Sequence, residues 1–124
     1  MKRANFESVI NDLKSLIQNS LEDGKAENIV TVDLHGKSDI ADLMVIASGT
    51  SSKHSSFLAE KLIRQIKEYD SGVVSCVEGL SEGNWVLVDA GDIIIHIFKP
   101  EIRQMYNLEK MWSVCTPEAE LIVN

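Results

Sequence analysis

The apolar residues of the first 21 positions recur with the spacing of one helical face. They lie mostly three or four residues apart, at Phe6, Val9, Ile10, Leu13, Leu16, Ile17 and Leu21. This spacing predicts an amphipathic helix. Asn5 is its expected N-cap, because a short side-chain carbonyl can accept a hydrogen bond from the first turn. Gly24 marks its expected end.

Two β-prone segments follow this helix. Residues 27–34 contain several β-branched side chains, and residues 35–38 have the composition of a turn. Residues 43–47 are five consecutive apolar residues. A run without alternation predicts a strand that is covered on both faces.

A second helix is expected after the polar turn at residues 48–52. Ser51 or Ser52 can cap it, and apolar side chains continue at helical spacing. These side chains include Leu58, Leu62 and Ile66, flanked by Phe57, Ile63 and Tyr69. Residues 70–72 end the predicted helix, since they combine Asp, Ser and Gly.

Three strands and a closing helix complete the predicted fold. The strands are expected at residues 73–77, 85–90 and 93–98. The last two form a hairpin around Gly91 and Asp92. Pro100 halts the sheet, and residues 101–112 offer apolar positions for a short or broken helix. The order α-β-β-α-β-β-β-α predicts an α/β sandwich with a mixed five-stranded sheet.

The predicted hairpin has two chemically different faces. A two-residue loop at Gly91-Asp92 makes one face entirely aliphatic. The other face carries three mixed pairs: Trp85 opposite Phe98, Leu87 opposite His96, and Asp89 opposite Ile94. An apolar centre with a polar edge is typical of protein-binding surfaces. Alternatively, Trp85 packs under a helix or loop, or a three-residue loop shifts the register and moves Trp85 to the aliphatic face.

The composition is that of one soluble domain, with 124 residues, 44% of them hydrophobic and 25% charged. We expect residues 1–116 to form a single α/β domain and residues 117–124 to form a disordered tail.

No apolar run approaches the ~20 residues of a membrane span. The N-terminus lacks the apolar stretch of a secretory signal, so we expect a cytoplasmic protein without membrane contacts.

Negative charge is concentrated between residues 73 and 98. This segment has no Lys or Arg and carries Glu78, Glu82, Asp89 and Asp92, in a chain of net charge −7. Capture of a nucleic-acid backbone needs clustered positive charge, so nucleic acid is not expected as the main contact. An acidic surface favours a basic partner, and it equally suits a solvated face that keeps the protein soluble.

One alternative is a nucleotide-binding or nucleotidyl-transfer enzyme. Residues 48–53 join a strand to a helix N-terminus, where backbone amides and Lys53 could hold a phosphate with Asp42 as a carboxylate partner. The turn does not match the P-loop pattern. The carboxylate pairs Asp39 with Asp42 and Asp89 with Asp92 have a spacing that sends side chains to opposite faces of a strand. Hairpin chemistry explains the second pair better than a metal clamp.

The cysteines and histidines indicate neither a metal site nor a catalytic site. Cys76 and Cys115 form no CxxC motif. The histidines are scattered over a turn, a helix start and a strand, at His35, His54 and His96. We therefore predict no catalytic residue, no metal and no cofactor.

A series of residues runs through most of the chain in a characteristic order. It comprises Asp33, Ser38, Ala41-Asp42, Val45 to Gly49, Ser52-Lys53-His54, Glu78-Gly79, Gly83 to Asp89, His96-Ile97-Phe98, Arg103, Tyr106, Leu108-Glu109 and Trp112. In this order and spacing, residues 5–113 resemble the ribosomal silencing factor family, also called Iojap or RsfS. The departures preserve packing: Leu43 and Met44 replace a usual aromatic, Ser48 a Thr, and Met105 and Met111 a Phe and a Leu.

The resemblance implies a nucleotidyltransferase-like α/β fold without the catalytic carboxylates, and a role that is not enzymatic. It implies binding to large-subunit ribosomal protein fourteen of the L series on the intersubunit face. The bound factor would hinder joining of the small subunit and lower translation when nutrients run short. The resemblance also points to homodimers of the free protein. A role as an adaptor in large-subunit assembly is an alternative that the sequence does not separate.

The predicted docking surface consists of Trp85, Leu87, Asp89 and His96, with Lys53 and His54 nearby. Trp85 is the expected apolar anchor, and Asp89 with the acidic segment orients the partner. A second group of residues is expected to tie the closing helix to the sheet: Arg103, Tyr106, Glu109 and Trp112.

Overall fold

The computed structural model describes residues 2–36, 39 and 41–107, and in these the helices and strands follow the predicted order. The elements are α1 (Lys2–Asp23), β1 (Glu27–Asp33), β2 (Leu43–Ser48), α2 (Ser52–Tyr69), β3 (Cys76–Glu78), β4 (Trp85–Ala90), β5 (Ile93–Phe98) and α3 (Pro100–Tyr106). The boundaries of β4 and β5 are those predicted. The proposed tail at residues 117–124 lies outside the described residues.

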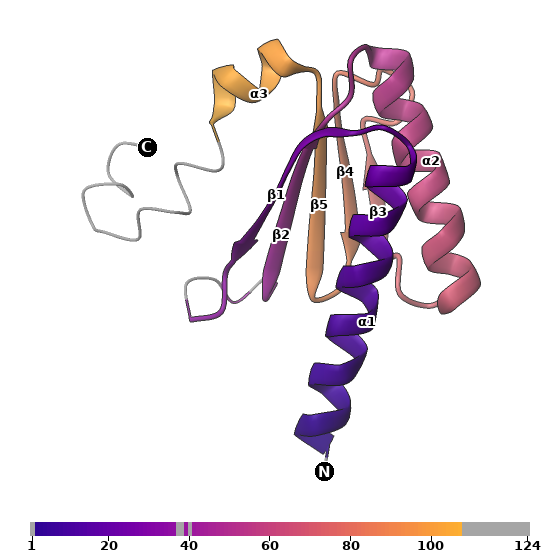
Figure 1. The fold of residues 1–124 in the computed structure, drawn as a ribbon, viewed down its shortest axis with the longest axis vertical. Coiled ribbons are helices and arrows are strands. Elements are labelled where there is room, and N and C mark those ends of the chain that lie inside the picture. The colour runs from indigo at the N-terminus through magenta and orange to yellow at the C-terminus, as the bar shows by residue number, and fades with distance from the viewer. Residues whose placement is uncertain (1, 37–38, 40, 108–124) are drawn as a thin grey trace.

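The five described strands form one mixed sheet in the order β1-β2-β5-β4-β3 (Figure 1). β2 and β5 are parallel, and the other neighbours are antiparallel. The connection through α2 therefore carries the chain from β2 across the sheet to the far edge. This confirms the predicted fold class.

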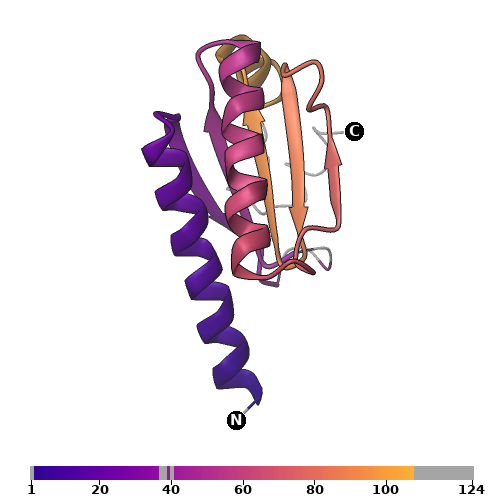
Figure 2. The same cartoon turned by 90° about the vertical axis from the view of Figure 1, so that its right-hand side faces the viewer.

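Both long helices cover the same face of the sheet (Figure 2). Their inward side chains form the main core with the inward side chains of the central strands. Fully buried members include Ile17 and Leu21 of α1, Leu58, Leu62 and Ile66 of α2, Val86 and Val88 of β4, and Ile95 and Ile97 of β5. Each such side chain contributes roughly 1.5–3 kcal/mol of hydrophobic stabilisation. The aliphatic face of the hairpin is therefore the core face.

A second, smaller core lies on the opposite face of the sheet, beside α3. It contains Val32, Leu34, Ala41, Met44, Ile46 and Phe98. β2 contributes to both cores, because Val45 and Ala47 face the helices while Met44 and Ile46 face away. This explains its run of apolar residues and confirms the prediction that this strand is covered on both faces.

The ends of α2 agree with the predicted signals. Ser51 is the N-cap, and its hydroxyl accepts a hydrogen bond of 3.1 Å from the His54 amide. Asp70 is the C-cap.

Two predicted boundaries were wrong. α1 begins at Lys2, so Asn5 lies inside the helix; Lys, Arg and Ala are good helix formers and extend it toward the N-terminus. β3 spans only Cys76–Glu78, because it is an edge strand and only these residues pair with β4. The closing helix α3 is short, as predicted: it ends at Tyr106, and Asn107 takes a left-handed conformation with φ of 49°. Residues 108–112 of the predicted segment lie outside the described residues.

No helix within the described ranges is both long and apolar enough to traverse a bilayer.

Candidate protein-binding surface

The β4–β5 hairpin has the register predicted from a two-residue loop. Trp85 pairs with Phe98, Leu87 with His96, and Asp89 with Ile94. Gly91 adopts a φ of 77°, which the loop requires, and its amide donates a 3.0 Å hydrogen bond to Asp89 Oδ1. The hairpin role expected for Asp89 is therefore present in the structure.

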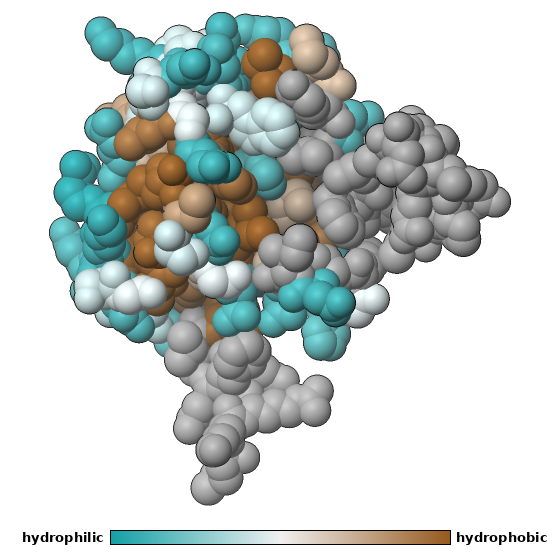
Figure 3. Space-filling model, turned by 180° about the vertical axis from the view of Figure 1, so that it is seen from behind, coloured by the Kyte–Doolittle hydropathy of each residue, from teal (hydrophilic) through white to brown (hydrophobic). Residues whose placement is uncertain are grey.

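We call the side of the sheet opposite α1 and α2 the open face. Cross-strand partners share a face, so the register identifies its members. They are Val30 and Val32 of β1, Met44, Ile46 and Ser48 of β2, Cys76 and Glu78 of β3, Trp85, Leu87 and Asp89 of β4, and Ile94, His96 and Phe98 of β5. In the space-filling view, an apolar area is surrounded by hydrophilic residues on this side (Figure 3).

The open face contains a compact aromatic cluster. The Trp85 ring stacks on Phe98 with a centroid distance of 4.9 Å and an interplanar angle of 22°. Trp85 Nε1 donates a 2.9 Å hydrogen bond to His96 Nδ1, and the two rings are tilted by 45°. Phe98 is buried, whereas Trp85 and His96 are half-buried. The indole is thus held by its neighbours while part of it stays at the surface.

Burial lowers the pKa of His96 from 6.5 to about 4. A charged imidazolium would lose hydration among the rings and aliphatic side chains around it. His96 is therefore neutral at physiological pH, which agrees with the acceptor role of its Nδ1 atom.

The strand that borders this cluster is acidic and polar. Glu78 and Cys76 are exposed on β3, in the same cross-strand rows as Leu87 and Asp89. Asp89 itself is half-buried. The open face therefore combines a half-buried apolar centre with an acidic edge.

The structure places four of the six predicted docking residues on one face of the sheet, and the other two, Lys53 and His54, on the first turn of α2. Trp85, Leu87, Asp89 and His96 share the open face. Lys53 is exposed on the first turn of α2, beside the loop that leads to Trp85; the neighbouring Ser52 hydroxyl donates a 2.8 Å hydrogen bond to Asn84 Oδ1.

His54 serves as a connection between helices in the structure. Its Nδ1 atom accepts a 2.9 Å hydrogen bond from the Thr50 amide. The proton must then be on Nε2, which donates to the Gly24 carbonyl oxygen at 2.9 Å. His54 thus links the start of α2 to the end of α1, on the helical side of the sheet.

Comparison with known proteins assigns this chain to a family. The model of the family described as ribosomal silencing factor during starvation matches residues 7–123. The chain belongs to the ribosomal silencing factor family. Ribosomal silencing factor RsfS of Zymomonas mobilis is 55% identical over 101 residues, covering 82% of this chain and 75% of that protein.

Two further matches extend this result to structure and to eukaryotes. A crystal structure of a Chromobacterium violaceum protein matches with a TM-score of 0.80 at 33% identity, covering 87% of this chain and 89% of that one. The mouse protein named mitochondrial assembly of ribosomal large subunit protein 1 is 31% identical, over 76% of this chain and 42% of its own length. Ribosomal silencing factors are regulators.

The residues of the alternative nucleotide site do not meet in this ribosomal silencing factor. Asp42 precedes β2 and Ser48 ends it, which separates them by roughly 20 Å along an extended strand. Among the described residues, no group of three or more His, Cys, Asp or Glu side chains is placed to hold a metal ion. The pKa of Asp92 is raised by burial and by the nearby Asp42 carboxylate.

The sequence predicted that Arg103 ties the closing helix to the sheet, but it did not identify the partner residue. Arg103 of α3 is buried, and its Nη1 atom donates a 2.8 Å hydrogen bond to the buried Ser48 hydroxyl. This contact agrees with the predicted tie between the closing helix and the sheet. Glu109 and Trp112 lie outside the described residues. The Trp85–His96 hydrogen bond was also missed, although the predicted register places both residues on one face.

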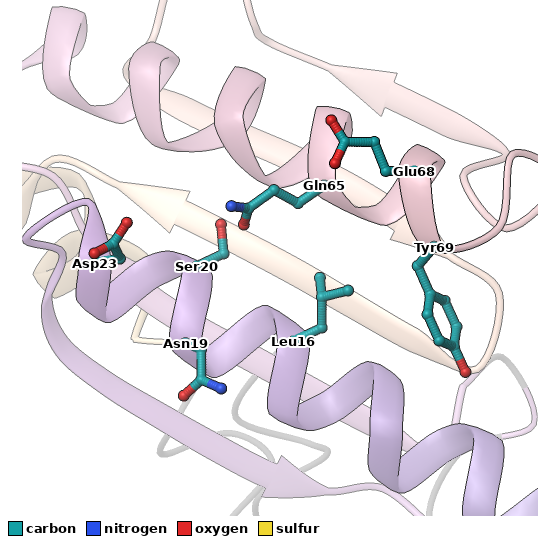
Figure 4. A pocket seen from close by; sticks show the side chains of 7 residues that line it. All are labelled: Leu16, Asn19, Ser20, Asp23, Gln65, Glu68 and Tyr69. Carbon is teal, nitrogen blue, oxygen red and sulfur yellow. The ribbon is translucent and has the colours of Figure 1, made fainter.

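A groove with polar side chains lies between α1 and α2, on the other side of this ribosomal silencing factor (Figure 4). It is lined by Leu16, Asn19, Ser20, Asp23, Gln65, Glu68 and Tyr69. Lys61 pairs with Asp23 beside it. The groove lacks the aromatic cluster and continuous apolar area of the open face, so it is a weaker candidate for protein binding.

Proposed function

We propose that this protein docks through its open face on ribosomal protein fourteen of the large subunit, at the intersubunit surface, and so prevents the small subunit from joining. Translation would fall as a result, chiefly when nutrients are short. The observation that carries the proposal is the half-buried aromatic cluster on a sheet face left open by both long helices, in a chain of this family. The expected location is the cytoplasm, where bacterial ribosomes work.

The chemistry of the open face supports a protein partner. Trp85 is half-buried and stacked, which limits the conformational entropy it loses on binding. Leu87 adds half-buried apolar area in the next cross-strand row, and Ile94 adds more in the row after that. Interface energy concentrates in a few central aromatic residues of this kind. Trp85 is therefore the proposed anchor.

The charge of the surface supports a basic partner. Glu78 and Asp89 lie at its edge, and residues 73–98 contain neither Lys nor Arg. Complementary charge speeds association and selects between partners more than it adds affinity. These acids favour a basic ribosomal protein over ribosomal RNA as the main contact.

Blocking needs only the volume of the domain. A compact chain of 124 residues has a radius of gyration of about 14 Å, which corresponds to a diameter of roughly 35 Å. Subunit bridges form by direct contact between surfaces. A body of this size on the intersubunit face would hold the two subunits apart without any chemical step.

Replacement of Trp85 tests the docking surface. Trp85→Ala should reduce capture of purified large subunits at least tenfold, because truncation of a central aromatic anchor typically costs ~2 kcal/mol or more. Phe57→Ala is the matched control, since Phe57 is an exposed aromatic residue on α2, away from the open face. Undiminished capture by a folded Trp85→Ala protein would contradict the proposal.

A second candidate function is assembly of the large subunit. The name of the mouse relative, mitochondrial assembly of ribosomal large subunit protein 1, favours it. The same open face would serve. Accumulation of large-subunit precursors in a deletion strain would support assembly, whereas mature subunits that join too readily would support silencing.

The open face is also the proposed contact of a homodimer in the free protein. An exposed apolar area of this kind favours self-association when its partner is absent. Sedimentation at micromolar concentration should show a dimer that Trp85→Ala weakens, and a strictly monomeric wild type would contradict this.

A further inference from the structure

The Trp85–His96 hydrogen bond determines where the imidazole proton lies. An indole nitrogen can only donate, so His96 Nδ1 must accept and carries no proton. The ring is neutral, and a neutral imidazole has one N–H group. That proton is therefore on Nε2.

The surroundings of His96 keep this state in place. Trp85 and Phe98 lie with ring centroids 5.8 Å from it, Leu87 is its cross-strand partner on β4, and Ile46 is its partner on β2. Glu78 lies farther along the same cross-strand row, on β3. None of the salt bridges among the described residues involves His96. A neutral ring with the proton on Nε2 is the state that this environment selects.

The Nε2–H group reaches the surface. Within the described part of the chain, the buried side-chain polar atoms without a hydrogen-bond partner are the hydroxyls of Ser20 and Ser55. His96 Nε2 has no partner among the described residues, and it is not one of these buried atoms. It therefore retains contact with solvent, in the middle of the open face.

We infer that His96 presents its Nε2–H as a directed hydrogen-bond donor on the docking surface, and that the partner meets it with a neutral carbonyl oxygen. This inference rests on the proposed function of the open face. A carboxylate is the less suitable acceptor, because Glu78 lies in the same row and Asp89 at the edge would repel it. Trp85 supplies apolar contact, and His96 supplies the polar group that sets the register of the complex.

A donor that loses water on binding must find an acceptor, since an unpaired buried polar group is costly. Removing the donor should therefore weaken binding about tenfold. A substitution can replace one of the two ring nitrogens of His96 and leave out the other. The donor role of Nε2 can therefore be tested separately from the structural role of Nδ1.

Two substitutions test the roles of the two ring nitrogens of His96 separately. In His96→Asn, the amide oxygen can replace Nδ1 as the acceptor for Trp85, but nothing replaces the Nε2 donor. In His96→Gln, the amide nitrogen can reach the position of Nε2. We expect His96→Asn to bind isolated large subunits about tenfold more weakly than wild type, and His96→Gln to recover part of the loss.

The nitrogen NMR shifts of His96 and the indole N–H signal of Trp85 complete the test. The free wild-type protein should show the proton on Nε2, and a coupling between Trp85 Nε1 and His96 Nδ1 across the hydrogen bond. A proton on Nδ1 would overturn the inference whatever the variants do. So would His96→Asn binding like wild type while Trp85→Ala fails to bind. If Trp85→Ala itself binds normally, the proposed function fails instead.

Discussion

At the residue scale, Trp85 is a side chain whose position is set before any partner arrives. Phe98 supports its flat surface, and His96 accepts its only polar hydrogen. A free surface tryptophan would lose rotational freedom on binding, whereas this one has already lost most of it. Preorganisation of this kind raises affinity without adding contacts.

The buried imidazole gives a pH-dependent stability that can be measured. The pKa of His96 falls from 6.5 to about 4 on folding, so between these values the unfolded chain binds a proton that the folded chain does not. The free energy of unfolding should therefore fall as the pH drops from 6.5 to 4, by as much as ~3 kcal/mol. Above pH 6.5 His96 is neutral in both the folded and the unfolded chain, so its contribution to the free energy of unfolding is constant.

Denaturant titrations of the wild type and His96→Asn across this range isolate the effect. The other titrating groups are common to both proteins, so the difference between the two curves reports His96. The difference should change between pH 6.5 and 4 and level off on either side. Parallel curves throughout the range would contradict a buried neutral imidazole.

At the element scale, the loop between β3 and β4 positions the start of β4. Gly79 has a φ of 80°, and a Cβ atom there would collide with the Trp85 carbonyl oxygen. Gly91 in the hairpin loop has a φ of 77°, but a Cβ atom there meets nothing within 4 Å. Both glycines therefore have a backbone conformation that strains other residues, but only Gly79 lacks room for a Cβ atom.

Alanine substitution at the two glycines separates these effects. Gly91→Ala should cost about 1–2 kcal/mol for the left-handed conformation alone. Gly79→Ala should cost a further ~1–3 kcal/mol and displace Trp85, because the backbone of β4 must move. Thermal unfolding measures the loss of stability, and capture of large subunits measures the effect of displacing Trp85. Equal losses at the two positions would show that the loop does not position Trp85.

The sequence predicts those elements whose signals are local. The two mainly apolar runs on either side of the Gly91-Asp92 loop predicted the boundaries and register of β4 and β5, and Ser51 predicted the start of α2. Signals that depend on distant partners were missed. The length of β3 is set by what β4 offers at the edge of the sheet, and the role of His54 is set by the Gly24 carbonyl of another helix.

The open face illustrates the same limit. Its membership follows from strand register, which the sequence predicts. Which of its side chains remain half-exposed depends on what α3 and the adjoining loops cover, as the burial of Phe98 next to the half-buried Trp85 shows. Periodicity assigns a residue to a face but not to a depth on that face.

At the scale of the whole molecule, the two sides of the sheet have separate tasks. The helical side contains the main hydrophobic core, and the open face is the proposed binding surface. Residues 73–98 are without Lys or Arg, whereas α2 carries Lys53, Lys61, Arg64 and Lys67 together with Glu60 and Glu68.

Charge on the open face should act on the rate of association. Glu78→Gln should slow binding to large subunits several-fold at low salt and have little effect at high salt, because screening removes long-range attraction. Glu60→Gln, an exposed acid on α2, is the matched control and should leave the rate unchanged. Equal effects of both substitutions would indicate a response to net charge alone.

The central claim is that this protein keeps ribosomal subunits apart by occupying the large one. Purified large and small subunits can be mixed with wild-type protein or Trp85→Ala and separated on a sucrose gradient. We predict that the wild type sediments with free large subunits and reduces the peak of joined ribosomes, and that Trp85→Ala does neither. Joined ribosomes that form normally with wild-type protein bound to them would contradict the account.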